Sequence, residues 1–388
     1  MKEAFGVLEF FAGGGMAGLG LGPRWKRLFA NEWSGKKAAA YRNNFSPAAE
    51  LTVRDVRDLT VDDIPGQAHL AWASFPCQDL SLAGAGRGLN GERSGTFHAF
   101  WNLIRELGEK GRAVPLVVLE NVAGALSSNQ GRDFAVLFEN LAGAGYLAGP
   151  LVIDAVRFLP QSRPRLFIPA VKLPHGPPPE LTLPGPDGAW HSRAIITAHD
   201  RLPGELKKSW VWWKLPLPGE RTVSLADVVE KRPDGVAGWR SPSETEALLK
   251  LMDPVNLHKI EEMGRLDRPV VGTVYKRTRP DGQGRGRQRA EVRFDQISGC
   301  LRTPGGGSSR QIILEVNGKA VRSRLITARE AARLMGLPDS YLLPEKYNDA
   351  YHLVGDGLAV PVVAHLAAHL LEPLAAAADR DRAVRGGC

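Results

Sequence analysis

Three short polar motifs follow apolar stretches of this sequence that are typical of β-strands. They are a glycine-rich turn at residues 12–18, the run Phe75-Pro76-Cys77-Gln78, and the run Glu120-Asn121-Val122. Amphipathic stretches separate the strands and predict helices, so the strands should form a parallel sheet with helices on both faces. Ligands of such sheets bind beyond the carboxyl ends of the strands. The turn, the thiol and the carboxylate are therefore predicted to form one reaction site.

The alternation of strands and helices predicts an α/β fold for the first part of the chain. Strands are expected at 7–11, 28–31, 70–75, 116–120, 151–154 and 166–170, and helices at 34–44, 96–109 and 131–144. The pattern stops at a proline cluster that begins after Leu173, because proline continues neither a helix nor a central strand. We therefore expect residues 1–174 to form the first part of a catalytic domain.

The rest of the chain is expected to leave this domain and then return to it. Residues 175–320 have little regular periodicity and should form a second, smaller domain. Helical periodicity returns in 321–378, where Thr327 and Glu330 form a capping box and a last helix starts near Pro361. These residues should complete the first domain, and residues 379–388 should form a frayed, flexible tail.

Composition and charge indicate a soluble protein of the cytoplasm. The 388 residues are 43% hydrophobic and 24% charged, as in ordinary globular proteins. No apolar run approaches the roughly 18 residues that span a membrane, and the N-terminus lacks the pattern of a signal peptide. Cys77, Cys300 and Cys388 show neither metal-ligand spacing nor a disulfide framework. The net charge of +8 favours a polyanionic partner, although many basic proteins bind no nucleic acid.

The glycine-rich turn has the spacing of a nucleotide-binding loop. Residues 13–18 contain G-x-G-x-x-G directly after a strand, and glycine there allows positive φ and close approach of the backbone to a ligand. Glu32, at the end of the next strand, could hold both hydroxyls of a ribose. Trp33 could stack on adenine, and Asp55 could accept a hydrogen bond from its amino group. Taken alone, the turn supports binding of a dinucleotide about as well as it supports binding of S-adenosylmethionine. It could also be only a tight turn.

Cys77 lies between a rigid proline and a long segment rich in glycine. Residues 78–95 contain five glycines, a composition typical of a mobile lid over an active site or of a disordered surface loop. A lone cysteine is usually a small buried hydrophobic residue. Its position at a strand end favours a nucleophile here.

The order of the motifs resembles that of the DNA (cytosine-5)-methyltransferase family, of the bacterial type. The shared motifs are Phe11-Ala12-Gly13-Gly14-Gly15, Phe75-Pro76-Cys77-Gln78, Arg93-Ser94-Gly95, Glu120-Asn121-Val122, Gln161-Ser162-Arg163-Pro164-Arg165, and the stretches 327–336 and 355–363. The resemblance covers both ends of the chain and leaves out 175 to about 295. It implies a Rossmann-like, S-adenosylmethionine-dependent methyltransferase domain with a smaller, irregular target-recognition domain.

The resemblance also implies a covalent mechanism. Cytosine C5 is a poor nucleophile, and addition of the Cys77 thiolate at C6 would turn the ring into an enamine whose C5 attacks the methyl group. Glu120 would contact N3 and the exocyclic amine. Arg163 and Arg165 would contact the base, orient Glu120 and favour the thiolate. The target base would be flipped out of the duplex, since it cannot react inside it. Glu120 could instead cap a helix, and the two arginines could be a solvated basic pair.

The cofactor and DNA contacts are expected from residues along the whole chain. The cofactor, S-adenosyl-L-methionine with S-adenosyl-L-homocysteine as product, is expected to be bound by Phe11, Ala12, Gly13, Gly15, Met16, Glu32, Trp33, Asp55, Val56, Pro76, Phe97 and Asp356. DNA contacts are expected from Gln78, Ser81, Arg87, Arg93, Arg277, Arg279, Arg285, Arg287, Arg289, Arg302 and Arg310. No metal is expected. Trp210, Trp212 and Trp213 are interpreted as core residues rather than as wedges between bases.

One position departs from the family pattern. Many relatives have asparagine where Asp356 stands. Its carboxylate could accept hydrogen bonds from the cofactor's amino or hydroxyl groups, or it could repel the cofactor's carboxylate.

The expected function is methylation of cytosine C5 in a specific double-stranded DNA sequence, in a restriction–modification system or as a solitary epigenetic methylase. We expect a monomer without membrane contact, with a cognate restriction endonuclease as a possible partner. A tRNA cytosine-5 methyltransferase of the same family and a non-catalytic DNA-binding homologue are alternatives. A nicotinamide oxidoreductase would leave the Phe-Pro-Cys-Gln motif unexplained.

Overall fold

The chain forms two compact units. The structure is a computed structural model that describes residues 4–76, 95–231, 233, 235–280, 285–303 and 310–386. The first unit consists of Met1–Asp154, Pro164–Pro218 and Val362–Cys388, and the second of Ala155–Arg163 and Gly219–Pro361. The chain therefore leaves the first unit and later returns to it.

The limits of these units differ from the domain boundaries expected at 174 and 320. Residues that follow the proline cluster pack onto the first unit up to Pro218. The Val211 N–H donates to the Ala148 carbonyl at 2.9 Å, and the Lys214 N–H donates to the Leu181 carbonyl at 2.8 Å. The proline cluster interrupts the alternation of strands and helices, but it does not end the unit.

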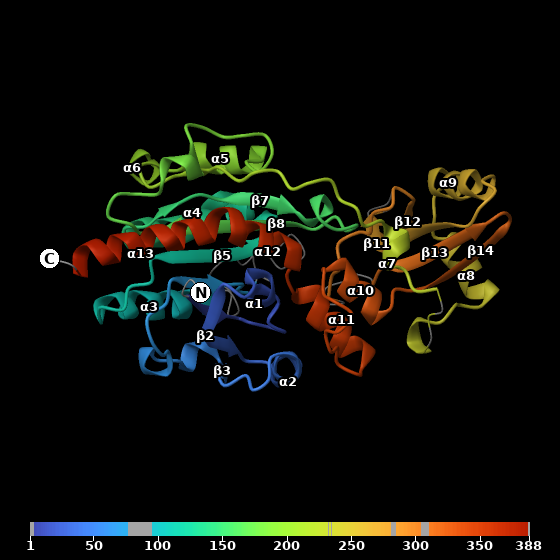
Figure 1. Cartoon of the computed structure of the whole chain (residues 1–388). Coiled ribbons are helices and arrows are strands. Elements are labelled where there is room, and N and C mark those ends of the chain that lie inside the picture. Colours follow the sequence, from blue (N-terminus) through green and yellow to red (C-terminus); the bar gives the residue numbers. More distant parts are fainter. Residues whose placement is uncertain are drawn as a thin grey trace. The chain divides into compact units, whose positions relative to one another are not determined.

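The first unit is built on an eight-stranded sheet (Figure 1). Its strands are β1 (Phe5–Phe10), β2 (Trp25–Glu32), β3 (Leu51–Val53), β4 (Leu70–Ala73), β5 (Leu116–Val122), β6 (Leu147–Ala148), β7 (Leu151–Asp154) and β8 (Pro164–Val171). The order is β3-β2-β1-β4-β5-β8-β6, and β7 also pairs with β8. The first five strands are parallel, which confirms the predicted α/β fold.

The prediction of a wholly parallel sheet is wrong for β8. This strand runs antiparallel to β5, β6 and β7. Its amino end therefore lies at the carboxyl end of β5, where Arg165 pairs with Val122. This direction matters for the site, because residues just after the start of β8 lie at the edge where the parallel strands end.

Alternate side chains of the strands form the core on each face of the sheet. Leu8, Ala71 and Leu119 belong to one buried cluster that includes the apolar side chains of α3 and α4. The residues between them in each strand, such as Trp72 and Val118, are fully buried on the other face. Strands buried on both faces have continuous apolar runs, which explains the composition of 70–75 and 116–120.

The three helices expected from the sequence are confirmed to within two residues at each end. They are α2 (Gly35–Asn44), α3 (Thr96–Glu109) and α4 (Arg132–Gly143). The other helices of this unit are α1 (Met16–Leu21), α5 (Arg193–Arg201), α6 (Gly204–Lys207) and α13 (Glu372–Gly386), and β9 (Thr182–Leu183) pairs with β10 (Trp212–Trp213).

The second unit contains an antiparallel sheet that the sequence pattern did not reveal. Its strands, in the order β12-β11-β13-β14, are β11 (Val270–Pro280), β12 (Gly286–Arg293), β13 (Ile312–Asn317) and β14 (Ala320–Leu325). Its helices are α7 (Leu225–Val228), α8 (Pro242–Leu249), α9 (Pro254–Gly264), α10 (Ala328–Leu334) and α11 (Tyr347–Asp356), and α12 (Val360–Leu366) follows. The predicted capping box of α10 is confirmed, since the Thr327 hydroxyl accepts from the Glu330 N–H at 3.0 Å.

The frayed tail expected from residue 379 is wrong as far as Gly386. The helix α13 continues through it, and the Asp379 carboxylate lies 2.8 Å from Nε2 of His69. The guanidinium of Arg382 also donates to the Ala68 carbonyl at 3.4 Å. These contacts with the segment before β4 hold the helix in place.

One helical stretch meets the length and composition of a membrane span, contrary to the expectation from the sequence. It covers Tyr347–Ala383. Its most apolar window is 56% buried within the protein, and Leu366, Leu370 and Leu374 are fully buried there. Burial of this extent is typical of a core helix.

Candidate active site

The glycine-rich turn leaves β1 in a conformation that favours glycine. Gly13 has φ 58° and Gly15 has φ 77°, in the left-handed region that side chains disfavour. A Cβ atom on Gly15 would lie 2.3 Å from the Phe45 ring, whereas one on Gly13 would meet nothing within 4 Å. The turn is therefore packed tightly on one side and has open space beside Gly13 on the other.

Glu32 ties this turn to the end of β2. Its buried carboxylate accepts the Gly13 N–H and the Ser34 N–H, both at 2.8 Å. Each carboxylate oxygen can accept more than one hydrogen bond, so Glu32 can still accept from the two hydroxyls of a ribose. Trp33, the next residue, is 71% exposed and offers its ring to a ligand.

Asp55 and Val56 follow β3 near the same edge of the sheet. Both oxygens of Asp55 accept from the Arg57 guanidinium, at 3.0 and 2.7 Å. These hydrogen bonds lower the pKa of the Asp55 carboxyl. It is therefore an ionised acceptor at neutral pH, and an adenine amino group would have to share it with Arg57. Val56 is buried.

The carboxylate of Glu120 is held at the carboxyl end of β5. It is buried, and one of its oxygens lies 3.3 Å from Nε of Arg165 in β8. The antiparallel direction of β8 brings the arginine to this position. Arg165 is only partly buried, with 20% of its side chain exposed, and the ion pair restrains both side chains. Arg165 is thus paired with a carboxylate rather than fully solvated.

The chain that precedes Cys77 lies beside this pair. β4 and β5 are adjacent and parallel, and the side-chain amide of Asn121 donates to the Phe75 carbonyl at 3.4 Å. Pro76 follows Phe75 directly in the sequence. Cys77, Gln78, Ser81, Arg87 and Arg93 lie outside the described residues. The anchoring role of Asn121 was not recognised from the sequence, although its place in the Glu-Asn-Val motif could have indicated it.

Other expected cofactor residues occupy the walls of this edge. Phe97, at the start of α3, is fully buried, with its ring centroid 5.4 Å from that of Phe75. Ala12 and Met16 are also buried beside the turn, whereas Phe11 is only partly buried.

Arg163 has structural partners within the second unit. Its guanidinium is buried and donates to the carbonyls of Leu301 at 2.9 Å, Gly355 at 2.9 Å and Gly357 at 2.7 Å. The last two residues flank Asp356, whose carboxylate accepts from the Thr303 hydroxyl. Arg163 therefore fixes the backbone on both sides of Asp356. The sequence pattern did not indicate this role, because the backbone carbonyls that an arginine contacts cannot be identified from a sequence.

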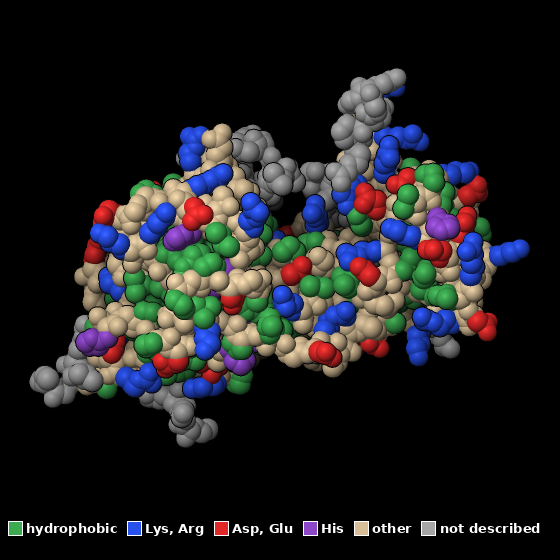
Figure 2. All heavy atoms as spheres, turned by 90° about the horizontal axis from the view of Figure 1, so that it is seen from above, with side chains coloured by type: hydrophobic (Ala, Val, Ile, Leu, Met, Phe, Trp, Pro, Cys, Tyr) green, Lys and Arg blue, Asp and Glu red, His purple; other side chains and the backbone are tan. Residues whose placement is uncertain are grey.

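The arginines expected to contact DNA differ in their surroundings. Arg285, Arg287 and Arg289 are exposed on or beside β12. Arg277 on β11 pairs with Glu291 at 3.0 Å, and Arg310 donates to the Asn348 side chain. Arg302 is exposed, and nothing is described of the Arg279 side chain. On the face seen in Figure 2, lysines and arginines alternate with acidic side chains rather than gathering in one patch.

Comparison with known proteins decides the family. The model of the C-5 cytosine-specific DNA methylase family matches residues 5–372. The chain belongs to this family. The Type II methyltransferase M.HpaII of Haemophilus parainfluenzae is 24% identical to this C-5 methylase, over 96% of this chain and 91% of that protein. M.NgoBI of Neisseria gonorrhoeae is 32% identical to it, over 87% of this chain and 83% of that protein.

Solved structures confirm the fold of the C-5 methylase. The Dnmt2 methyltransferase of S. pombe matches with a TM-score of 0.61 and 18% identity, over 96% of this chain and 99% of that one. A putative DNA modification methyltransferase encoded within an E. coli prophage matches with a TM-score of 0.53 and 18% identity. The match covers 97% of this chain and 100% of that one.

The family makes this protein a DNA (cytosine-5-)-methyltransferase of the restriction–modification type, and therefore a user of S-adenosylmethionine. The open space beside Gly13, the carboxylate of Glu32 and the exposed ring of Trp33 fit that cofactor. Within the described ranges, no group of three His, Cys, Asp or Glu side chains could hold a metal ion.

Proposed function

We propose that this C-5 methylase modifies cytosine in a specific double-stranded DNA sequence by covalent catalysis from Cys77. The observation that supports this most directly is the ion pair of the buried Glu120 with Arg165, beside the strand end that leads to Cys77. A buried carboxylate at the carboxyl edge of parallel strands is suited to hydrogen bonding with the polar edge of a base. A cysteine that follows directly in the chain can approach the same base.

The reaction balances as an addition followed by an elimination. The Cys77 thiolate forms a bond to C6 of cytosine, and the electron pair of the C5–C6 double bond becomes available at C5. S-adenosylmethionine supplies the methyl group that C5 takes up, and S-adenosylhomocysteine is the product. A base then removes the C5 proton, the double bond re-forms and the thiolate leaves. The enzyme returns to its first state with 5-methylcytosine released.

Glu120 and Arg165 would prepare the base for this addition. Glu120 would hydrogen-bond N3 and the exocyclic amine, which draws electrons from C6 and makes it more electrophilic. Arg165, 3.3 Å from the carboxylate, would keep Glu120 in place. Arg163 would act by positioning, through the carbonyls beside Asp356.

The cofactor would lie along the carboxyl edge of β1, β2 and β3. Glu32 would accept the ribose hydroxyls, Trp33 would stack on the adenine, and Asp55 would accept from its amino group. The remaining contacts proposed from the sequence are those of Phe11, Ala12, Gly13, Gly15, Met16, Val56, Pro76, Phe97 and Asp356.

The β11–β12 hairpin is the proposed DNA-reading element of the second unit. Backbone register places Arg277 opposite Arg289 and Arg279 opposite Arg287, and like charges directly opposite destabilise a hairpin. Phosphates or guanine edges would compensate this repulsion. Arg302 and Arg310 are proposed as further contacts, and the target base would be flipped out of the duplex.

The biological setting is also proposed. The enzyme would act as a monomer in the bacterial cytoplasm or nucleoid, with or without a cognate restriction endonuclease. Its relatives with Type II names favour the restriction–modification setting.

Trapping with 5-fluorocytosine tests the mechanism. The enzyme is incubated with S-adenosylmethionine and duplex DNA of mixed sequence that contains this base, and a denaturation-resistant adduct is located by peptide mass spectrometry. Fluorine cannot leave C5 as a proton, so we expect DNA attached to Cys77 and no adduct with Cys77→Ala. Sequencing of the trapped DNA gives the target site. An adduct only with fluorinated tRNA would show the RNA-methylating alternative, and no adduct with either would contradict the covalent mechanism.

A further inference from the structure

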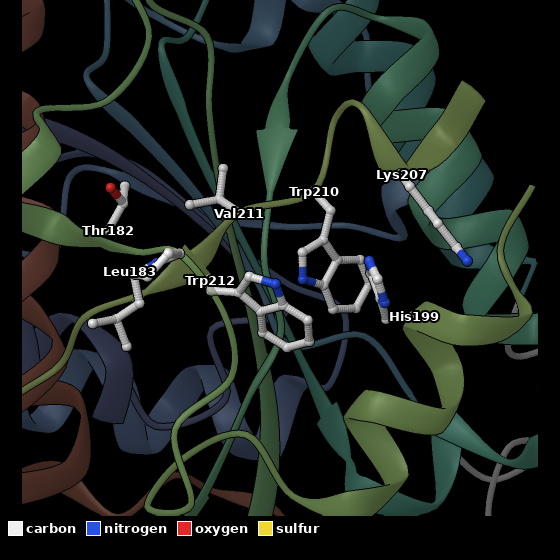
Figure 3. A pocket seen from close by; sticks show the side chains of 8 residues that line it. Thr182, Leu183, His199, Lys207, Trp210, Val211 and Trp212 are labelled. Carbon is white, nitrogen blue, oxygen red and sulfur yellow. The ribbon is translucent and has the colours of Figure 1, made fainter. Parts of the chain in front are cut away.

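A pocket of about 390 Å³ lies within the first unit (Figure 3). It is lined by Thr182, Leu183, Pro184, His199, Lys207, Trp210, Val211 and Trp212. Its volume falls within the range of sites that hold small molecules. No step of the proposed methyl transfer uses any of these residues.

The side chains of an extended segment point alternately to its two sides, and this explains why two tryptophans line the pocket. Ala148 in β6 accepts from the Val211 N–H at 2.9 Å, which fixes the segment against the sheet. Trp213 points inward, is fully buried, and donates from its indole N–H to the Pro169 carbonyl at 3.1 Å. Trp210 and Trp212 lie on the opposite side of the extended segment and are only partly buried. Trp213 is thus a buried core residue, and Trp210 and Trp212 are partly buried and pack against the core cluster of the first unit.

Three aromatic rings contact one another at the pocket. The centroids of Trp210 and Trp212 are 5.1 Å apart, and His199 lies 4.9 Å from the first and 5.1 Å from the second. Figure 3 shows His199 beside the Trp210 ring, with Lys207 on the same side. Rings this close leave no space for a cation between them, so the group is not an aromatic cage. The planes of Trp210 and Trp212 meet at 62°, so a planar ligand can stack on the face of one of these rings but not on both.

The polar groups of the pocket favour a ligand with a negative charge. Lys207 lines it, and its ammonium group donates to the Asp200 carbonyl at 3.0 Å. An ammonium group has three N–H donors, so it can bind an anion as well. The buried indole N–H of Trp210 has no acceptor within the described part of the chain. This nitrogen is closed to the pocket, so it is no donor for a ligand there.

The pocket is separate from the catalytic edge. Ala148, which holds the Val211 segment, pairs with Ala170 in β8, and Ala170 pairs with Val117 in β5. Val117 precedes Glu120 by three residues, or roughly 10 Å along a strand. Two strand spacings across the sheet add to this separation.

We propose that this pocket binds a nucleotide, with the base stacked on the indole ring of Trp212 and the phosphate bound by Lys207. A base supplies the planar ring, and a phosphate supplies the charge. The nucleotide could be free or part of a single strand, since both present the same groups. This site is additional to the proposed methyl transfer and does not depend on it.

The test uses the full-length enzyme saturated with S-adenosylhomocysteine, so that the cofactor site is closed to nucleotides. Deoxycytidine monophosphate, deoxycytidine, inorganic phosphate and single-stranded oligodeoxycytidylate are titrated separately. Binding is followed by the indole N–H signals of the nine tryptophans in NMR spectra. We expect the nucleotide to shift the signals of Trp210 and Trp212 in a saturable way. Tighter binding of the oligonucleotide would identify a strand as the source, and tighter binding of the monophosphate would identify a free nucleotide.

Variants separate the two parts of the site. Loss of a base stack weakens binding about 5-fold to 150-fold. Trp212→Ala should therefore weaken binding of the nucleotide by this factor, and Trp212→Phe should weaken it by less. Lys207→Met should weaken binding of the nucleotide but not binding of the nucleoside. Lys208→Met is the matched control, because Lys208 is exposed and pairs with Glu205 outside the pocket lining, and it should bind as the unaltered enzyme does.

Three results would overturn the proposal. They are the absence of shifts at Trp210 and Trp212 up to the solubility limit of the nucleotide, equal binding by Lys207→Met, and shifts produced equally by phosphate alone. If Trp212→Ala fails to fold, Trp212→Phe and Lys207→Met still decide the outcome.

Discussion

At the residue scale, the carboxylate of Glu120 is the described side chain on which the proposed mechanism depends most directly. Glu120→Gln keeps the shape of the side chain but removes the charge that pairs with Arg165 at 3.3 Å. A hydrogen-bonding or proton-transferring carboxylate contributes about 10²–10⁴-fold to a rate. We therefore expect single-turnover methylation to slow by that factor while binding of duplex DNA changes little. Glu139→Gln, at an exposed site on α4, is the control and should react normally. A rate within a few fold of the unaltered enzyme would show that Glu120 does not prepare the base.

A second residue-scale prediction concerns the buried carboxyl of Glu9 in β1. Burial raises its pKa to about 7, from 4.5. The folded state therefore holds this proton up to higher pH than the unfolded state does, and stability decreases as pH rises from about 4.5 to about 7. Glu9→Gln removes this dependence. We expect the variant to gain about 1–3 kcal/mol relative to the unaltered protein between pH 5 and pH 8.

Urea unfolding at the two pH values measures this difference. Glu106→Gln, at an exposed position in α3, serves as the control and should show no such change. An equal effect of Glu9→Gln at both pH values would mean that Glu9 is ionised throughout.

At the scale of elements, the β11–β12 hairpin combines a cost in stability with a gain in binding. Arg287 and Arg289 face other arginines across the hairpin. Replacing both with glutamine should relieve a repulsion of about 0.2–1 kcal/mol for each pair. If each arginine contacts a phosphate, the slope of log affinity against log salt should decrease by about one for each.

Salt titrations of duplex DNA binding and thermal unfolding measure the two effects. Lys319→Gln changes an exposed charge at the turn between β13 and β14 and is the control. Unchanged DNA affinity in the double variant would remove the hairpin from the DNA-reading surface.

Elements also show what the sequence could and could not predict. The helix α3 could be predicted because one apolar face repeats along it, and the tight turn after β1 because glycines follow a strand. The direction of β8 could not be predicted, since an apolar run reads the same in both directions. The pair of Glu120 and Arg165 depends on that direction. The sheet of the second unit was missed because arginines occupy the exposed positions of β12, which made the region resemble a charged loop.

At the scale of the whole molecule, each unit is completed by segments that lie far apart in the sequence. In the second unit, Arg163 joins three carbonyls, those of Leu301, Gly355 and Gly357. Arg163→Lys keeps the positive charge but has a single nitrogen, which cannot reach all three. Each buried carbonyl that loses its partner costs about 1–3 kcal/mol.

Local opening of the second unit should therefore become easier in Arg163→Lys. Hydrogen exchange followed by mass spectrometry should show faster exchange in the backbone around 298–303 and 354–360, with a loss of roughly 2–5 kcal/mol in stability there. Arg265→Lys, at an exposed site after α9, should exchange as the unaltered protein does. Because Gly355 and Gly357 flank Asp356, the same variant should weaken binding of S-adenosylhomocysteine if Asp356 contacts the cofactor. Faster exchange with unchanged cofactor affinity would separate the two roles and leave Arg163 as a purely structural link between distant parts of the chain.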